Sequence, residues 1–212
     1  MIMKTHRQVL KSVRAALLIV VGTCVLAACA SEAPLAGPVP KIGFAHLGTI
    51  PLNVDRIGVS STYQSPMKAP NAEQRFPTSP AQAMKIWAGS RLQAVGGAGS
   101  PATAQFVIED ASVIETKLEK TKGFKGMFTY EPTARYDAHA VAHLSVQEAP
   151  GGVSGIASGE IRVSATRSVE VRENATLGER EKAWFEMIEA LMADFNSQME
   201  TQIHAHLQRW MR

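Results

Sequence analysis

The stretch YDAHAVAHLSV, residues 136–146, decides the fold of this 212-residue chain. Small or apolar residues occupy every second position from Tyr136 to Val146, and mostly polar residues stand between them. Successive side chains of a strand point to opposite faces, so this alternation predicts a strand with one packed face and one solvated face. The alanines of the packed face predict that a helix approaches the sheet closely.

Further strand patterns flank this stretch. Residues 106–118 predict the preceding strand, with a bulge at Glu109-Asp110, and residues 155–171 predict the following one. Two hairpins make these three strands antiparallel. An earlier strand is predicted over residues 50–59. Arg167 interrupts the apolar positions of the last strand, so we expect it at an edge or paired with an acid.

The first predicted helix begins at Ser79-Pro80, an N-cap residue followed by proline at the first helical position. Apolar residues at helical spacing carry it to Val95, and Gly96-Gly97 ends it. The stretch before it, residues 65–80, holds four prolines and is predicted to be a long loop. Loops of this length are often functional or poorly ordered.

The second predicted helix follows Thr176 and Glu179, which form a capping-box pattern, and runs to the C-terminus. Its apolar stripe has spacings of three and four and comprises Trp184, Ile188, Leu191, Phe195, Met199, Ile203, Leu207 and Trp210. The last turns extend beyond a small sheet, so Leu207 and Trp210 are candidates for an exposed apolar patch that contacts a partner or lipid.

The predicted order is strand, helix, three strands, helix. It favours an α+β fold, a two-layer sandwich with a mainly antiparallel sheet and both helices packed on one of its faces. Residues 42–212 are enough for one domain with its own core.

The N-terminus has the pattern of a secretory signal. Lys4, Arg7, Lys11 and Arg14 precede an apolar run of about 12 residues, and small residues follow it. The alternative, a transmembrane anchor, needs roughly 20 apolar residues. We therefore predict a signal peptide over residues 1–28.

Leu26-Ala27-Ala28-Cys29 closes this segment and resembles the lipobox of bacterial lipoproteins at every position. The resemblance implies cleavage before Cys29, a diacylglyceryl group on its thiol and an acyl chain, such as palmitate, on its new amino group. The alternative is an ordinary secretory signal. Ala30 and Ser31 resemble the class sorted to the outer membrane, facing the periplasm. The periplasmic face of the inner membrane is the alternative. Residues 29–41, rich in Pro and small residues, would then be a tether.

Cleavage would change the charge and cysteine content of the chain. Residues 1–28 hold four of the 22 Lys and Arg and none of the 19 Asp and Glu, so their removal shifts the net charge from +3 to −1. The basic character of the full chain therefore does not indicate nucleic-acid binding, which needs a retained basic face. Cys24 would leave with the signal and Cys29 would carry lipid, which excludes disulfides and cysteine-based metal sites.

Catalytic and metal-binding motifs are absent from the sequence. His139 and His143 share a predicted strand face but lie about 13 Å apart along it, too far to bind one zinc ion. Glu109, Asp110 and Glu131 have no visible partner. We therefore predict no metal, no cofactor other than the covalent lipid, and no enzymatic activity.

Residues 117–130, between two predicted strands, combine lysines with aromatic and apolar residues. The simpler interpretation is a hairpin whose aromatic side chains pack on the core. The functional interpretation is a segment that contacts an anionic amphiphile or a protein partner, with lysines toward phosphates. We call it the contact segment, and its candidate residues are Lys120, Lys122, Phe124, Lys125 and Phe128.

The lipobox, the tether and the order strand, helix, three strands, helix together resemble small envelope lipoproteins of Gram-negative bacteria, the LPS-assembly lipoprotein and the auxiliary lipoproteins of ABC-type lipid transport. Residues 50–59 followed by Trp87-Ala88-x-x-Arg91-Leu92 are similar to an early strand pair and a Trp-bearing helix in the second group. The resemblance implies an accessory or binding subunit of an envelope complex, or a protein that binds a lipid or LPS. A periplasmic hydrolase and a purely structural lipoprotein are the alternatives. Paired carboxylates or a Ser-His pair in a cleft would favour the hydrolase.

Overall fold

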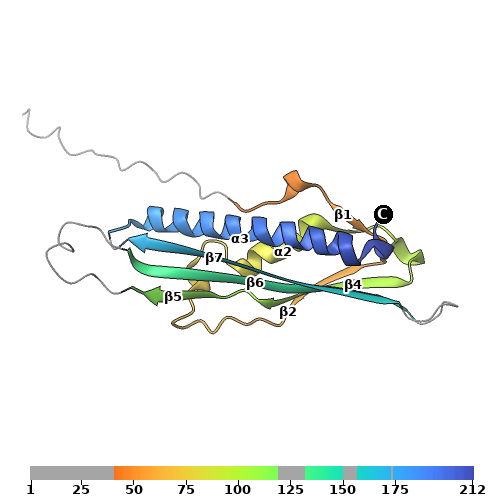
Figure 1. Ribbon diagram of the computed structural model, residues 1–212, viewed down its shortest axis with the longest axis horizontal. Coiled ribbons are helices and arrows are strands. Elements are labelled where there is room, and N and C mark those ends of the chain that lie inside the picture. The colour runs from red at the N-terminus through yellow and green to blue at the C-terminus, as the bar shows by residue number, and fades with distance from the viewer. Residues whose placement is uncertain (1–40, 119–131, 150–156, 173) are drawn as a thin grey trace, which may run out of the picture. The chain divides into compact units, whose positions relative to one another are not determined.

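The computed structural model describes residues 41–118, 132–149, 157–172 and 174–212. In chain order they form β1 (Ile50–Leu52), β2 (Ile57–Ser61), α2 (Pro80–Arg91), β3 (Leu92–Ala94), β4 (Ala102–Asp110), β5 (Val113–Lys117), β6 (Pro132–Glu148), β7 (Ser158–Arg172) and α3 (Leu177–His206). Two helices on one face of a mainly antiparallel sheet confirm the predicted α+β sandwich (Figure 1).

Strand β6, which contains the alternating stretch, is the centre of a five-stranded sheet. Strand β7 pairs with one side of β6, while β4 and β5 pair one after the other with its other side, all antiparallel. Strand β2 lies outside β4 and parallel to it. The prediction of one strand over residues 106–118 is therefore corrected to two, and the register changes at the predicted bulge.

The prediction of one strand over residues 50–59 is wrong, and so is the predicted helix end at Val95. The chain turns after Leu52, so that β1 pairs with β3 in a separate parallel sheet while β2 joins the main one. Helix α2 ends at Arg91, and the backbone N–H of Val95 donates to the carbonyl of Leu52 at 2.9 Å. Pairing with a strand distant in sequence overrides the local helical spacing.

The helix starts agree with the sequence. The hydroxyl of Ser79 accepts a hydrogen bond from the N–H of Gln82 at the start of α2, and Thr176 and Glu179 form the predicted capping box of α3. The predicted continuation of the second helix to the C-terminus is wrong. Helix α3 ends at His206, and a short 3₁₀ helix, Gln208–Trp210, follows.

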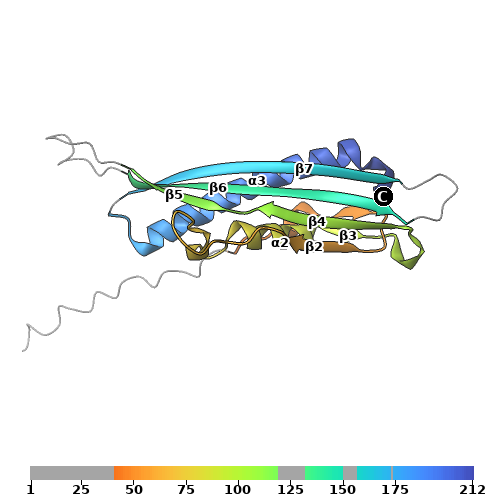
Figure 2. The same ribbon diagram turned by 90° about the horizontal axis from the view of Figure 1, so that it is seen from below.

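The core lies between the helices and one face of the sheet, which Figure 2 shows from its opposite side. The alanines of the packed face of β6 are buried, as predicted. Trp87 of α2, Phe106 of β4 and Phe195 of α3 contact one another with ring centroids 5.3 to 6.4 Å apart. None of the described helices covers the other face of the sheet.

The expected exposure of Leu207 and Trp210 is wrong. Their exposed fractions are 0% and 5%. The 3₁₀ helix folds back over Gly159, whose missing side chain leaves room for both residues. The carbonyl of Trp210 accepts from the N–H of Asn53 at 2.6 Å, and its indole N–H donates to Glu148 at 3.0 Å. Both residues belong to the core of the described chain and are not available there as a contact patch.

Candidate functional site

Most of the sequence-predicted site residues lie outside the described part of the chain. They are Cys29 and the five contact-segment residues Lys120, Lys122, Phe124, Lys125 and Phe128. Only the first two residues of the contact segment, Lys117 and Leu118, belong to the described part of the chain. Lys117 is the last residue of β5, and Leu118 follows it. The structure therefore shows what surrounds the start of this segment.

Lys117 and Leu118 line a pocket of about 380 Å³ between the ends of β5, β6 and β7 and the start of α3. We call it the basic pocket. Its lining residues are Glu115, Lys117, Leu118, Ala134, Tyr136, Val171, Arg172 and Arg180. Apolar side chains therefore lie beside three cations, and four separate elements contribute to the wall.

The carboxylate of Glu115 is already engaged by a fourth cation. Arg75 donates to one of its oxygens at 2.7 Å, and the hydroxyl of Tyr136 donates to the other at 2.8 Å. The charge of Glu115 is thus balanced by Arg75. Lys117, Arg172 and Arg180 then leave the basic pocket with a net positive charge.

Aromatic rings back the basic pocket. Tyr136 meets Trp184 of α3 edge-on at 5.3 Å between ring centroids, and Phe76 stacks on Trp184 at 4.5 Å. The guanidinium of Arg75 lies 5.7 Å from the Tyr136 centroid and 5.8 Å from that of Trp184, within cation–π range. Burial and the bond to Glu115 raise the pKa of Tyr136, so its hydroxyl remains a neutral donor.

Two buried nitrogens at the start of α3 have no hydrogen-bond partner among the described residues. They are the Nε of Arg180 and the indole Nε1 of Trp184, one helical turn apart. Buried donors are nearly always satisfied in proteins. Arg180 also lines the basic pocket, although its Nε is itself shielded from solvent.

No family model matches this chain, and no curated protein matches it. The chemistry of the basic pocket therefore has to be argued from its own residues. Three donors with fixed positive charge and an apolar wall suit an anion joined to a hydrocarbon group, because phosphate and carboxylate oxygens pair with guanidinium groups while alkyl chains avoid water.

The solvated face of the sheet carries a second group of charged residues. Glu109, which the sequence left without a partner, accepts from Arg162 at 2.6 Å and lies 2.9 Å from Nδ1 of His143. Arg162 and then His143 lower the pKa of Glu109. Among the described residues, His143 has no hydroxyl partner. The group therefore lacks the nucleophile of a Ser-His pair, and His139 is not part of it.

The predicted loop over residues 65–80 is organised by Glu73, a carboxylate that is 3% exposed. It accepts from the hydroxyls of Ser65 and Tyr63 and from the backbone N–H of Val113. Burial raises the pKa of Glu73, and these hydrogen bonds more than offset it, so its pKa is lowered overall. Burial and Glu73 together raise the pKa of Tyr63. The network ties the loop to β5 and leaves Glu73 ionised.

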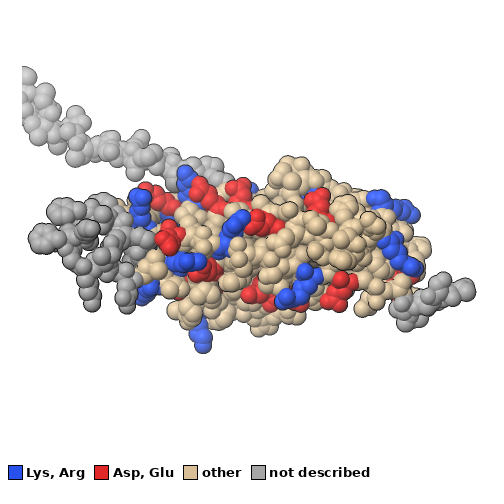
Figure 3. All heavy atoms as spheres, in the orientation of Figure 1, with Lys and Arg blue, Asp and Glu red and all other residues tan. Residues whose placement is uncertain are grey.

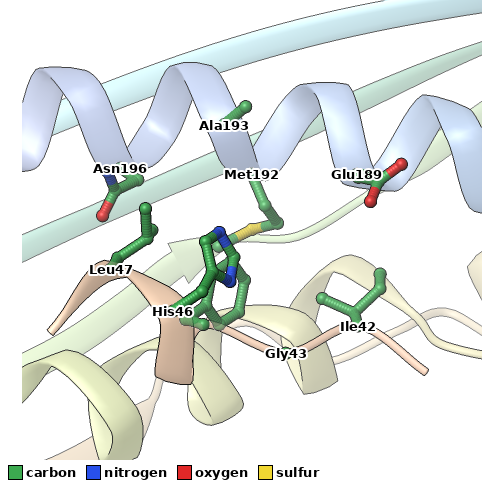
Figure 4. A pocket seen from close by; sticks show the side chains of 9 residues that line it. Ile42, Gly43, His46, Leu47, Glu189, Met192, Ala193 and Asn196 are labelled. Atoms are coloured by element: carbon green, nitrogen blue, oxygen red, sulfur yellow. The ribbon is translucent and has the colours of Figure 1, made fainter.

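A separate pocket of about 310 Å³ lies between residues 42–47 and α3 (Figure 4). Met192 and Asn196 reach from α3 toward the 42–47 segment. Ile42, Phe44 and Leu47 supply most of the other apolar lining. Among the described residues its wall holds Glu189 and His46 but no Lys or Arg, so it lacks the fixed positive charges of the basic pocket.

The surface of the described residues shows no cluster of a single charge on the face seen in Figure 3, where basic and acidic side chains are interspersed. No group of His, Cys, Asp or Glu among these residues could hold a metal ion. No described helix is both long and apolar enough to cross a membrane.

Sequence reasoning found the start of the basic pocket at Lys117 but missed Arg172 and Arg180. These two arginines end β7 and begin α3, and the sequence places them on either side of the capping-box pattern. A strand and a helix joined by a short connection place their adjoining ends together. That signal could have placed both arginines close to each other at one end of the sheet.

Proposed function

We propose that this chain is a lipid-anchored lipoprotein of the bacterial envelope that faces the periplasm. In this role it is an accessory or binding subunit of a transport or assembly system. Its folded part binds an anionic amphiphile in the basic pocket. The lipobox-like sequence supports the anchor, and the basic pocket supports the ligand class.

One observation carries the ligand class. Lys117, Arg172 and Arg180 surround a wall made by Leu118, Ala134 and Val171, and the nearby carboxylate is already neutralised by Arg75. A water-soluble anion would use only the cations, and an alkane only the wall. An amphiphile with one anionic group uses both.

The contact segment supports the same ligand class from the sequence. It leaves the basic pocket at Leu118 and continues with three further lysines and two phenylalanines, Lys120, Lys122, Phe124, Lys125 and Phe128. Basic and apolar residues thus continue directly from the wall of the basic pocket along the chain.

Titration of the full chain with a fluorescent fatty acid, 11-(dansylamino)undecanoic acid, tests the proposal. We expect saturable binding that is at least tenfold weaker for the double variant Arg172→Gln/Arg180→Gln, because each charge-assisted hydrogen bond contributes about 1.5 to 3 kcal/mol. The methyl ester of the probe, which lacks the anion, should bind weakly to the unmodified chain.

The matched control is Arg56→Gln/Lys182→Gln, which removes the same charge from exposed positions outside the basic pocket. This control should bind the fatty acid as the unmodified chain does. Equal loss in both double variants would show that net charge, and not the basic pocket, governs capture. Absence of binding to the unmodified chain would favour a purely structural lipoprotein.

A further inference from the structure

Strand β7 is a long strand at the edge of the sheet. It comprises 15 residues, Ser158–Arg172, and β6 is its only strand partner within the described part of the chain. Figure 2 shows β7 outermost, beyond β6. An edge strand of this length presents a row of backbone N–H and C=O groups that can pair with a further strand.

The charges on the solvated face of β7 have an unusual order. Glu160 and Arg162 stand near one end and Glu170 and Arg172 near the other, with only Ser and Thr on this face between them. When two copies of β7 are placed antiparallel about Thr166, Arg162 lies opposite Glu170 of the second copy. Glu160 then lies opposite Arg172 of the second copy. Opposite charges directly across a strand pair are stabilising.

Neighbouring registers are disfavoured by the same charges. A pairing centred on Ala165 places Glu160 opposite Glu170 of the second copy, and one centred on Arg167 places Arg162 opposite Arg172. Like charges directly opposite each other are destabilising. The charge order therefore selects one register and penalises its two nearest competitors, which is a property of specific interfaces.

The other face of β7 fits this register too. Val163 lies opposite Val169 of the second copy, and Ile161 lies opposite Val171. Arg167 carries a charge on the inward face of β7, which would otherwise disfavour pairing at this edge. In this register it lies opposite the small Ala165 of the second copy. Its guanidinium is already paired with Asp194 of its own α3 at 2.5 Å. Pairing of the two β7 strands therefore leaves the ion pair between Arg167 and Asp194 intact.

We propose that β7 is a homodimer interface, in which two copies join their sheets edge to edge about Thr166. The partner is a second copy because the complementarity is that of β7 with itself. Arg162 is paired with Glu109 of its own chain, which lies on β4 across β6, so in the dimer its side chain exchanges Glu109 for Glu170 of the second copy. This inference does not rest on the proposed ligand, and the two sites share only Arg172.

Single cysteines test the register in the full chain in detergent, with Cys24 and Cys29 replaced by Ser. Facing residues of an antiparallel pair have Cα atoms about 4.5 to 5.5 Å apart, which a disulfide can bridge. Thr166→Cys should therefore form a disulfide-linked dimer under mild oxidation. Ser164→Cys should not, because two copies of residue 164 lie about 13 Å apart along the strands. A mixture of Ser164→Cys and Ser168→Cys chains should cross-link.

Charge reversal tests the energetics by light scattering of the same chain without the added cysteines. Glu170→Arg faces Arg162 of the second copy and should weaken dimerisation at least tenfold. Mixing it with Arg162→Glu/Glu109→Gln chains should restore dimers, since both contacts become complementary and Glu109→Gln removes the repulsion within the chain. A monomeric unmodified chain, or equal cross-linking of Thr166→Cys and Ser164→Cys, would overturn the proposal.

Discussion

Arg91 joins three segments of the described chain. Its side chain is 2% exposed, and it donates to the carbonyls of Leu47 and Gly48, to Asn196 at 3.1 Å and to Glu200 at 2.9 Å. Asn196 also accepts from the indole N–H of Trp87 at 2.8 Å. Through Arg91, helix α2 holds both α3 and the segment that precedes β1.

Replacing Arg91 should destabilise the fold strongly. Arg91→Ala removes a buried side chain together with its hydrogen bonds to Leu47, Gly48 and Asn196, and we expect a loss of about 3 kcal/mol or more of unfolding free energy. Urea unfolding followed by circular dichroism measures it. Glu200→Gln is the matched control. Glu200 is 44% exposed, so its ion pair should be worth less than about 1 kcal/mol. Equal losses of unfolding free energy in Arg91→Ala and Glu200→Gln would contradict the view that the buried hydrogen bonds of Arg91 contribute most of its effect.

Glu73 should make stability depend on acid pH. Its pKa in the folded chain lies below the ordinary value of 4.5, so its contribution is present above that value and is lost as the pH falls through the folded pKa. Glu73→Gln should cost stability at neutral pH, and the difference from the unmodified chain should shrink in acid. Urea unfolding at about pH 7 and about pH 4 compares the two. The exposed Glu186→Gln should show no such convergence, and a pH-independent difference for Glu73→Gln would contradict the assignment.

At the level of elements, the contact between the 3₁₀ helix at Gln208–Trp210 and β7 depends on one glycine. A Cβ at Gly159 would lie 2.5 Å from the ring of Trp210 and 2.7 Å from Leu207. Gly159→Ala should therefore displace the 3₁₀ helix and cost about 1 to 3 kcal/mol, the usual range for overpacking.

The control for this prediction is Gly89→Ala in α2, where a Cβ would have nothing within 4 Å. Removing a glycine from a helix interior should stabilise the protein by up to about 1 kcal/mol. Thermal unfolding and the intrinsic tryptophan fluorescence, to which Trp210 contributes, measure both variants. If Gly159→Ala is as stable as the unmodified chain, the 3₁₀ helix does not pack against β7 as described.

How far the sequence predicts the fold also differs between elements. The alternation of β6 and the capping box of α3 are local patterns, and each is sufficient to predict its element from the sequence. Strand β3 was missed because Leu92–Ala94 continue a helical spacing and become extended only through pairing with β1. The basic pocket was half predicted. Lys117 belongs to a visible basic segment, whereas Arg180 becomes a pocket residue only when α3 begins beside β5 and β6.

On the scale of the whole molecule, the helices cover one face of the sheet and leave the other solvated, so the described chain has a single core. The basic pocket lies where β5 and β7 end and β6 and α3 begin, and the proposed dimer interface is the β7 edge. Arg172 of β7 belongs to both sites, and both include residues of the packed face, Tyr136 and Val171 in the basic pocket and Val163 and Val169 at the interface. Glu170→Arg and Thr166→Cys change interface residues that do not line the basic pocket, so these variants test self-association separately from ligand capture.

The proposed anchor leads to a prediction for the complete chain. When the full sequence is expressed in a Gram-negative bacterium with an alkyne-tagged palmitate, the protein should become labelled and should sediment with membranes. Cys29→Ser should abolish the label, because the thiol that receives the diacylglyceryl group is then missing. Cys24→Ser is the matched control, since it removes a thiol from the segment predicted to be cleaved and should leave the label unchanged.

More than one acyl chain is needed for stable anchoring, at about 0.8 kcal/mol per buried CH₂, so the unlabelled Cys29→Ser protein should lose its stable attachment. A labelled Cys29→Ser protein, or an unmodified chain that takes up no palmitate, would contradict the lipoprotein assignment without affecting the basic pocket or the β7 interface.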